Sequence, residues 1–155
     1  DFLLACLENL KDRVHTAVQT SGFCSEPTFE NILAAADYFL FDLKLADEKE
    51  HIRYTGVSNK LIRKNFKRLA ASGKSFVTRI PLIPGVTDTE HNIEAIAEFM
   101  NKNGVFYAEL MPYNKMAGGK YKAIGREYRP DFDPTAEVKI RKDIFKNHNI
   151  EITIL

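Results

Sequence analysis

The sequence predicts an α/β fold built on a parallel sheet, and two observations predict it. Short apolar runs alternate with amphipathic stretches of about 10 to 15 residues along the whole chain of 155 residues. Polar side chains gather where the apolar runs end, most clearly at Asp42 and Lys44. This alternation is typical of right-handed βαβ units, and it fits either an open doubly wound sheet or part of a β/α barrel.

Helices are expected wherever apolar residues recur at spacings of three and four. Each has a recognisable start or stop, such as a capping side chain, a capping box or a glycine. The predicted helices are, in order, 2–13, one capped by Ser25, one capped by Ser58 and stopped by Gly73, one opened by Thr87 and Glu90 and ending near Gly104, and one from Asp133 and Pro134 to Asn147.

The strands expected between these helices are 14–18, 38–45, 76–83, 105–111 and 150–155, with a long Gly- and Lys-rich loop before Asp133. In both parallel architectures ligands bind at the carboxyl ends of the strands. The candidate site residues are therefore the polar ones at those ends: Gln19, Thr20, Asp42, Lys44, Arg79, Glu109, Tyr113 and Asn114.

A purely structural role is open for several of these residues. Asp42 and Lys44 are two positions apart, so they share one face of a strand and can neutralise each other. Arg79 can serve as the partner of a carboxylate inside a barrel. A cluster this large favours a ligand, because Arg79 and Lys44 suit an anionic small molecule and Asp42 can accept hydrogen bonds from sugar hydroxyls.

Composition narrows the classes of function. A net charge of +1 argues against nucleic acid or an anionic membrane as partner, and no run reaches the roughly 18 apolar residues that span a bilayer. We expect a single cytoplasmic domain. Cys6 and Cys24 lie eighteen positions apart without a C-x-x-C pair, and the histidines lack metal-ligand spacing, so reduced structural thiols and no metal ligands are expected.

Four segments carry a resemblance to a known family. They are HTAVQTSGF, FDLKLADEKEHIRYTGVSN, RIPLIPGVTDTEHNI and ELMPYNKMAGGKYKAIGREY, and they follow one another along nearly the whole chain. Together they resemble the carboxyl-terminal two thirds of the glycyl-radical-enzyme activating enzymes, whose best-known member activates pyruvate formate-lyase.

The resemblance implies a radical S-adenosylmethionine enzyme with a partial, six-stranded β/α barrel. In that family a 4Fe-4S cluster, reduced by a donor such as flavodoxin or ferredoxin, gives an electron to S-adenosylmethionine. The resulting 5'-deoxyadenosyl radical removes a hydrogen atom from one glycine of a partner, here a glycyl radical enzyme similar to pyruvate formate-lyase. Cysteine thiolates hold the cluster.

The resemblance also assigns roles to residues. Asp42 and Lys44 correspond to the family's D-L-K residues that contact S-adenosylmethionine, and Arg79 corresponds to an arginine near its methionine part. Gln19, followed by Thr20, stands where the best-known member has an Asp that helps to hold a monovalent cation. Asn114 stands where that member has a His beside the cofactor, so it keeps hydrogen-bonding capacity but does not titrate. All of these residues are expected to bind cofactor.

The sequence departs from the family at its start. The C-x-x-x-C-x-x-C motif and the Gly-Gly-Glu segment are missing, and both are expected to precede Asp1, because the first thirteen residues resemble the helix that follows Gly-Gly-Glu. We therefore expect residues 1–155 to form one truncated radical S-adenosylmethionine barrel domain that lacks its first βα units. In this chain we expect no catalytic residues, no cluster and no activating activity.

Two other functions stay open. One is a degenerate partner-binding module that docks a glycyl radical enzyme without chemistry. The other is a different β/α enzyme in which Lys44 forms a Schiff base, which the neighbouring Asp42 disfavours because it stabilises the charged amine. The segment Thr55-Gly56-Val57-Ser58-Asn59 is a family landmark, but its physical interpretation is a turn followed by a helix cap.

Overall fold

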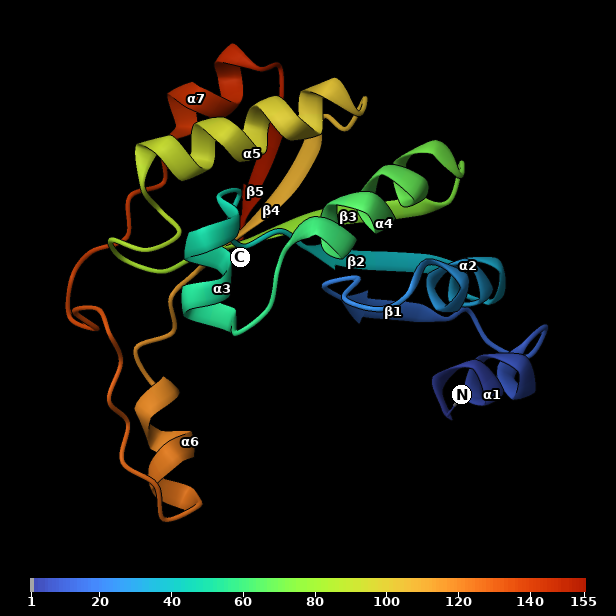
Figure 1. Ribbon diagram of the computed structural model, residues 1–155, viewed down its shortest axis with the longest axis horizontal. Helices are drawn as coiled ribbons and strands as arrows, with labels where there is room; N and C mark the ends of the chain where they lie inside the picture. Colours follow the sequence, from blue (N-terminus) through green and yellow to red (C-terminus); the bar gives the residue numbers. More distant parts are fainter. Residues whose placement is uncertain (1) are drawn as a thin grey trace.

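The computed structural model describes residues 2–155 and contains one five-stranded sheet (Figure 1). The strands are β1 (Ala17–Thr20), β2 (Tyr38–Asp42), β3 (Ser75–Leu82), β4 (Tyr107–Pro112) and β5 (Glu151–Ile154). They pair in chain order, and every pair is parallel. An open doubly wound sheet reverses its strand order at a switch point, and this sheet has no reversal. The predicted parallel α/β fold is confirmed, in a partial barrel-like arrangement.

Asp1 lies outside the described residues. Two expectations refer to it: the extent of the domain, 1–155, and the position of the cluster motif before Asp1. The structure tests neither of them, so both stay predictions.

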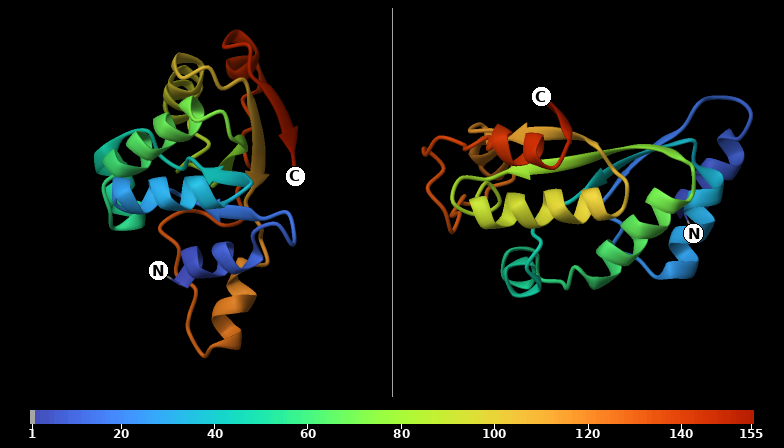
Figure 2. Two further views of the ribbon diagram at one scale, coloured as in Figure 1. Left: turned by 90° about the vertical axis from the view of Figure 1, so that its right-hand side faces the viewer. Right: turned by 90° about the horizontal axis from the view of Figure 1, so that it is seen from above.

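Helices precede the first strand and connect the later ones. They are α1 (Phe2–Leu10), α2 (Glu26–Ala35), α3 (Glu48–Thr55), α4 (Lys60–Ala71), α5 (Glu90–Lys102), α6 (Ala117–Ala123) and α7 (Lys142–Asn147). Figure 2 shows α4 and α5 lying along the same side of the strands. Among residues 2–155, none of the helices has the length and hydrophobicity needed to cross a bilayer.

The alternation of side chains along β2 separates the two faces of the sheet. Phe39 and Phe41 are fully buried on the face that the helices cover. There Phe41 meets Phe66 of α4 edge to face, with ring centroids 5.4 Å apart. Leu40 and Asp42 point to the opposite face, which we call the inner face. Because these helices cover the Phe face, the inner face is the surface on which polar side chains can meet a ligand.

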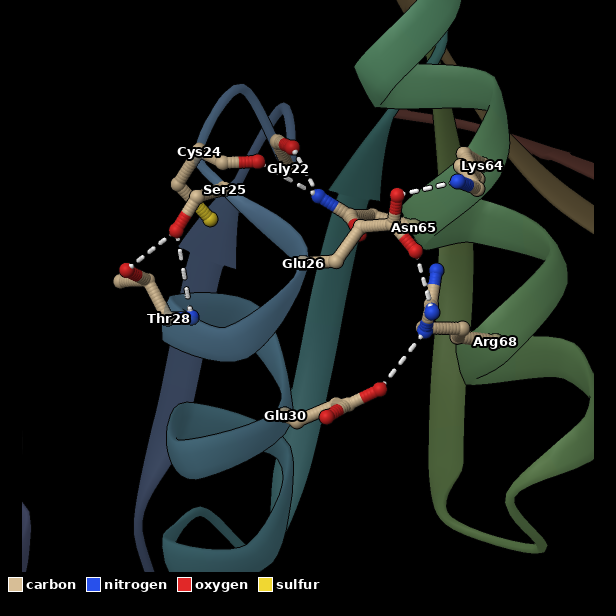
Figure 3. A network of polar contacts seen from close by, with 9 residues as sticks. All are labelled: Gly22, Cys24, Ser25, Glu26, Thr28, Glu30, Lys64, Asn65 and Arg68. Carbon is tan, nitrogen blue, oxygen red and sulfur yellow. Dashed lines mark hydrogen bonds and ion pairs between the residues drawn. The ribbon is translucent and has the colours of Figure 1, made fainter.

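Ion pairs and one buried amide join α2 to α4 (Figure 3). Glu26 accepts from Lys64 and pairs with Arg68, and these contacts, led by the Lys64 hydrogen bond, hold the pKa of Glu26 below its usual value. Asn65 is fully buried and its Nδ2 donates to the carbonyl oxygens of Gly22 at 2.8 Å and Cys24 at 3.0 Å. The loop that follows β1 is therefore held by α4, which lies beyond the next strand, β2.

The segment that follows β2 differs from the sequence-based prediction. It contains α3, which was not predicted, and the cap of α4 is Asn59 rather than Ser58. The Oγ of Ser58 accepts from the N–H of Lys60 at 3.2 Å and donates to Glu48 at 2.8 Å, joining α3 to the start of α4. Gly56 ends α3 in the left-handed conformation, so the interpretation of 55–59 as a turn and a cap is confirmed.

The predicted capping box at Thr87 was wrong. Thr89 caps α5, and its hydroxyl accepts from the backbone N–H of Asn92 at 3.3 Å. Thr87 is buried, where its Oγ1 accepts from the N–H of Ile83 and donates to the carbonyl of Pro81, both at 2.6 Å. The hydroxyl closes the turn after β3, so it is not available to a helix end.

The predicted helix from Asp133 to Asn147 was also wrong over most of its length. Asp133 accepts from the N–H and hydroxyl of Thr135 in a local turn, and the helix there is only α7. The residues just before α7 have no regular secondary structure, and the N–H of Lys139 donates to Oδ2 of the buried Asp88 at 2.8 Å. A backbone donor committed to a distant carboxylate cannot join a helix.

Hydrogen bonds between Thr16 and Asp37, which precede β1 and β2, give a pH-dependent prediction. Oδ2 of Asp37 accepts from the N–H and the hydroxyl of Thr16, both at 2.8 Å, and the backbone bond is the main cause that lowers the pKa of Asp37. A lowered folded-state pKa adds stability above the unfolded value of about 3.9, which is lost as pH falls through the folded value. Asp37→Asn should therefore be less stable than the unaltered chain at pH 7, and urea denaturation should show the difference shrinking below about pH 4. A difference that stays constant down to about pH 2.5 would contradict this assignment.

Gly22 gives a second prediction. Its φ is +70°, and a Cβ there would lie 2.5 Å from Cζ of Phe41. Gly22→Ala should lower the free energy of unfolding by about 2–4 kcal/mol, through backbone strain and overpacking. Gly56→Ala is the matched control, because Gly56 has a φ of +78° and an added Cβ there would meet no other atom within 4 Å. It should cost only about 1–2 kcal/mol in the same denaturation experiment. Equal losses would show that the contact with Phe41 is unimportant.

Candidate functional site

Three charged candidate residues lie in one row across the inner face. The register pairs Asp42 of β2 with Arg79 of β3, and Arg79 with Glu109 of β4. Thr153 of β5 completes the row. Lys44 projects to the same face two positions beyond Asp42, past the end of β2. The structure therefore brings together the candidates from three separate strand ends, as the parallel topology predicts.

Asp42 and Lys44 form a half-buried ion pair. Nζ of Lys44 lies 3.4 Å from Oδ2 of Asp42, and the side chains of Lys44 and Asp42 are 36% and 16% exposed, respectively. Oδ1 of Asp42 is buried and has no hydrogen-bond partner in the part of the chain that the structure describes. A buried carboxylate oxygen without a donor is costly, because it has lost its water without a replacement. The pair therefore does not fully satisfy Asp42.

Arg79 and Glu109 form the second pair of the row. Nε of Arg79 donates to Oε2 of Glu109 at 2.7 Å, and both side chains are about one fifth exposed, at 20% and 19%. This bond uses Nε, which leaves the terminal Nη groups of the guanidinium for another partner. Together the two pairs give the inner face two positive and two negative charges side by side.

Two of the sequence candidates lie at the edge of this arrangement. Gln19 of β1 is exposed and is in register with Leu40, so it lies on the inner face two positions before the row of Asp42. Thr20 is in register with Phe41 and belongs to the opposite face. Its Oγ1 accepts from the N–H of Gly22 at 2.9 Å, which shapes the turn after β1. The structure thus separates Gln19 and Thr20.

Asn114 and Tyr113 begin an arm, residues 113–141, that leaves the carboxyl end of β4 and carries α6 at its far end (Figure 1). Asn114 is exposed, and its Oδ1 accepts from the N–H of Met116 at 2.9 Å. The hydroxyls of Tyr113 and Tyr128 lie 2.7 Å apart, and burial, with this bond, raises the pKa of Tyr128 to about 12. Asn114 therefore lies just beyond the carboxyl end of β4, outside the charged row.

A cleft of about 480 Å³ opens beside Lys44. Its lining is mainly apolar and comes from the ends of β2 and β3, from α3 and from the arm. Tyr54 of α3 and Phe132 of the arm contribute aromatic surface. The sequence analysis missed both residues, because each lies in a polar segment whose path across the strand ends is a tertiary feature.

The backbone that carries Lys44 is held by two buried asparagines that the sequence analysis also missed. Asn92 of α5 accepts from the N–H of Ala46 at 2.8 Å and donates to the carbonyls of Lys44 at 3.0 Å and Thr87 at 2.8 Å. Asn59 donates to the carbonyls of Leu45 at 3.0 Å and Ala46 at 2.9 Å. These amides fix the chain just beyond the end of β2, so they set the position of Lys44.

Comparison with known proteins shows curated relatives but no matching family model. The trans-4-hydroxy-L-proline dehydratase activating enzyme of Clostridioides difficile is 35% identical over 148 residues, which are 90% of this chain and 49% of that protein. The isethionate sulfite-lyase activating enzyme of Nitratidesulfovibrio vulgaris is 40% identical over 129 residues, which are 81% and 42%. The chain thus spans about half the length of the curated relatives it matches.

A solved structure has the same fold. It is a domain of the pyruvate-formate lyase-activating enzyme from Bacteroides vulgatus ATCC 8482, with 26% sequence identity and a TM-score of 0.76. The match covers 99% of this chain and 89% of that chain. The agreement therefore extends over the whole sheet and its helices.

The support of Lys44 by Asn92 can be tested directly. Asn92→Ala removes three hydrogen bonds and leaves a buried N–H and two carbonyls without partners, so it should cost about 2–4 kcal/mol of unfolding free energy. NMR amide signals of residues 44–46 should shift as well. Asn9→Ala is the control, because Asn9 is exposed and its side chain makes one hydrogen bond within residues 2–155, to the carbonyl of Ala5. It should change stability by no more than about 0.5 kcal/mol. If both variants behave alike, Asn92 does not support this segment.

Proposed function

Because the chain belongs to the glycyl-radical-enzyme activating enzymes, which are radical S-adenosylmethionine enzymes, we propose that its inner face forms part of an S-adenosylmethionine site. The protein would use this site to activate a glycyl radical enzyme. The named relatives and the solved domain support the activating role. The chemistry of the whole protein, its partner and its electron donor are part of the proposal, since the chain covers about half of those relatives.

The unpartnered Oδ1 of Asp42 is the observation that carries the proposal. It is a buried acceptor beside a cation, on the face of the sheet opposite the helices that cover Phe39 and Phe41. A ribose hydroxyl would donate a hydrogen bond to this oxygen and so supply the partner that it lacks. The residues present therefore fit the nucleoside end of S-adenosylmethionine.

Arg79 of the row, together with the neighbouring Lys44, fits the methionine end of S-adenosylmethionine. Arg79 keeps its Nη groups for a carboxylate, and planar guanidinium groups bind carboxylates with two parallel hydrogen bonds. Lys44 keeps N–H donors beyond its contact with Asp42. In this assignment the chain's residues bind and orient the cofactor. When reductively cleaved, S-adenosylmethionine supplies the means of removing one hydrogen atom from the partner's glycine.

Gln19, Thr20 and Asn114 have smaller parts in the proposal. Gln19 lies on the inner face at the edge strand, where its neutral amide would hold a monovalent cation only weakly. Thr20 shapes the turn beside it through its bond to Gly22. Asn114 uses its amide oxygen for Met116, so only its amide nitrogen remains to donate to the cofactor.

The described residues do not fit a 4Fe-4S cluster. Residues 2–155 contain no group of three or more His, Cys, Asp or Glu side chains placed to hold a metal ion. Burial raises the pKa of the Cys24 thiol, which disfavours the thiolate that a cluster needs. We propose that the cluster belongs to a cysteine motif that would precede Asp1 in a longer protein, and that residues 1–155, as one barrel domain without its first βα units, have no activating activity alone.

The partner proposed for the complete protein is a glycyl radical enzyme similar to pyruvate formate-lyase. The electron donor proposed is a flavodoxin or a ferredoxin. The relatives are named for different enzymes, a dehydratase and a sulfite-lyase among them, so they support the class of partner and do not select one member of it.

Calorimetric titration of the purified chain with S-adenosylmethionine and with adenosine tests the cofactor site. We expect weak binding of both, with Kd on the order of 0.1–1 mM, because the site lacks the groups that the cluster would supply. Asp42→Asn should weaken both by about tenfold, through loss of a charged acceptor. Glu151→Gln is the control, because it removes one negative charge from the exposed edge strand β5. No binding by the unaltered chain would contradict the proposal.

Anaerobic reconstitution with iron and sulfide tests the proposal that the 4Fe-4S cluster belongs to another segment of the protein. The chain should bind iron well below one cluster per molecule, as measured by metal analysis and visible absorbance. Stoichiometric 4Fe-4S incorporation that survives gel filtration would contradict the assignment of the cluster to another segment.

A further inference from the structure

Arg79 lies between two carboxylates in the same row and pairs with one of them. Its register neighbours are Asp42 on β2 and Glu109 on β4. Adjacent strands are about 4.8 Å apart, so either carboxylate is within reach of an arginine side chain. Nε donates to Glu109 at 2.7 Å, whereas Oδ1 of Asp42 has no hydrogen-bond partner among the described residues.

The choice between the two carboxylates has an electrostatic reason. Asp42 already has a cation, because Nζ of Lys44 lies 3.4 Å from its Oδ2. If Arg79 turned to Asp42, two cations would share one carboxylate, and the largely buried Glu109 would lose the cation that pairs with it. An unpaired, partly buried carboxylate is costly. Glu109 therefore fixes the direction in which Arg79 points.

We propose that Glu109 is a positioning residue that holds Arg79 away from Asp42, and so leaves the buried Oδ1 of Asp42 without a protein partner, as an acceptor for a hydroxyl of the bound ligand. The proposal rests on the proposed function, because it concerns the same site. In this proposal Glu109 affects binding of the nucleoside end of the ligand, through Asp42. Its own contact is with Arg79, the residue assigned to the methionine end.

The consequence of removing Glu109 follows from this arrangement. Without its partner, Arg79 turns to Asp42, where a guanidinium can bind both carboxylate oxygens at once. The acceptor for the ligand's hydroxyl is then occupied by protein. A simpler role for Glu109, in which it only orients Arg79 toward the ligand's carboxylate, leaves Asp42 unchanged and has no effect on a ligand without a carboxylate.

Adenosine separates these two roles, because it has ribose hydroxyls and no methionine. In calorimetric titrations of the chain, Glu109→Ala should weaken adenosine binding by about tenfold. Glu109→Gln should act in the same direction, since a neutral amide competes poorly with Asp42 for a guanidinium. Glu151→Gln, which removes a negative charge from the neighbouring strand, should leave adenosine binding unchanged.

Rescue by a second substitution is the sharper test. In the double variant Glu109→Ala with Arg79→Ala, no guanidinium is present to occupy Asp42, so adenosine affinity should return to that of the unaltered chain. S-adenosylmethionine affinity should stay low, because the partner of its carboxylate is gone. A loss of adenosine binding caused by general damage to the fold would not be rescued by removing a further charged side chain.

Each outcome decides the matter. Unchanged adenosine affinity in both Glu109 variants, or a double variant that remains as weak as Glu109→Ala, would overturn the inference and leave the proposed function standing. If Glu109→Ala does not fold, by circular dichroism, then Glu109→Gln and its combination with Arg79→Ala give the same comparison. Failure of the unaltered chain to bind adenosine would instead overturn the proposed function, and this inference with it.

Discussion

The hydrogen-bonded register of β2, β3 and β4 is the constraint on which the rest of the molecule depends. Because side chains alternate along each strand, one register decides which residues enter the Phe-rich core and which face inward. A slip of one residue in β3 would turn Arg79 into the packed face and Ile80 out of it. The row of Asp42, Arg79 and Glu109 is thus stabilised by the same pairing that buries Phe41.

Lys44 and Arg79, the cations beside and within this row, are each paired, while one acceptor, Oδ1 of Asp42, has no partner among the described residues. Lys44 and Arg79 have a carboxylate partner each, and both pairs are shielded enough from water for their geometry to matter. An isolated cation on a half-buried sheet face would attract any anion. Pairing removes that nonspecific attraction, so a ligand must offer donors and acceptors in the matching arrangement.

The sequence predicted the parallel sheet and the gathering of Asp42, Lys44, Arg79 and Glu109 at strand ends, since these follow from the alternation of strands with helices and from strand-end topology. It did not predict α3, because half of 48–55 is charged and its buried residue is His51. Local signals could not choose between Thr87 and Thr89, since burial of the Thr87 hydroxyl depends on β3. Asn59 and Asn92 were missed because an asparagine in a polar segment carries no sign of the distant backbone that it binds.

The anchoring of the arm at both ends has a consequence for how such proteins can diverge. Its first residue is tied to the sheet, since the N–H of Tyr113 donates to the carbonyl of Leu82, and its last residues are tied through Lys139 to Asp88. Between two fixed ends, doubling the length of a loop costs only about 0.6 kcal/mol of closure entropy. Insertions and deletions in the intervening segment therefore leave the register of β3 and β4 unaltered. The outer part of this molecule can change in length and sequence while the polar row of the inner face is inherited intact.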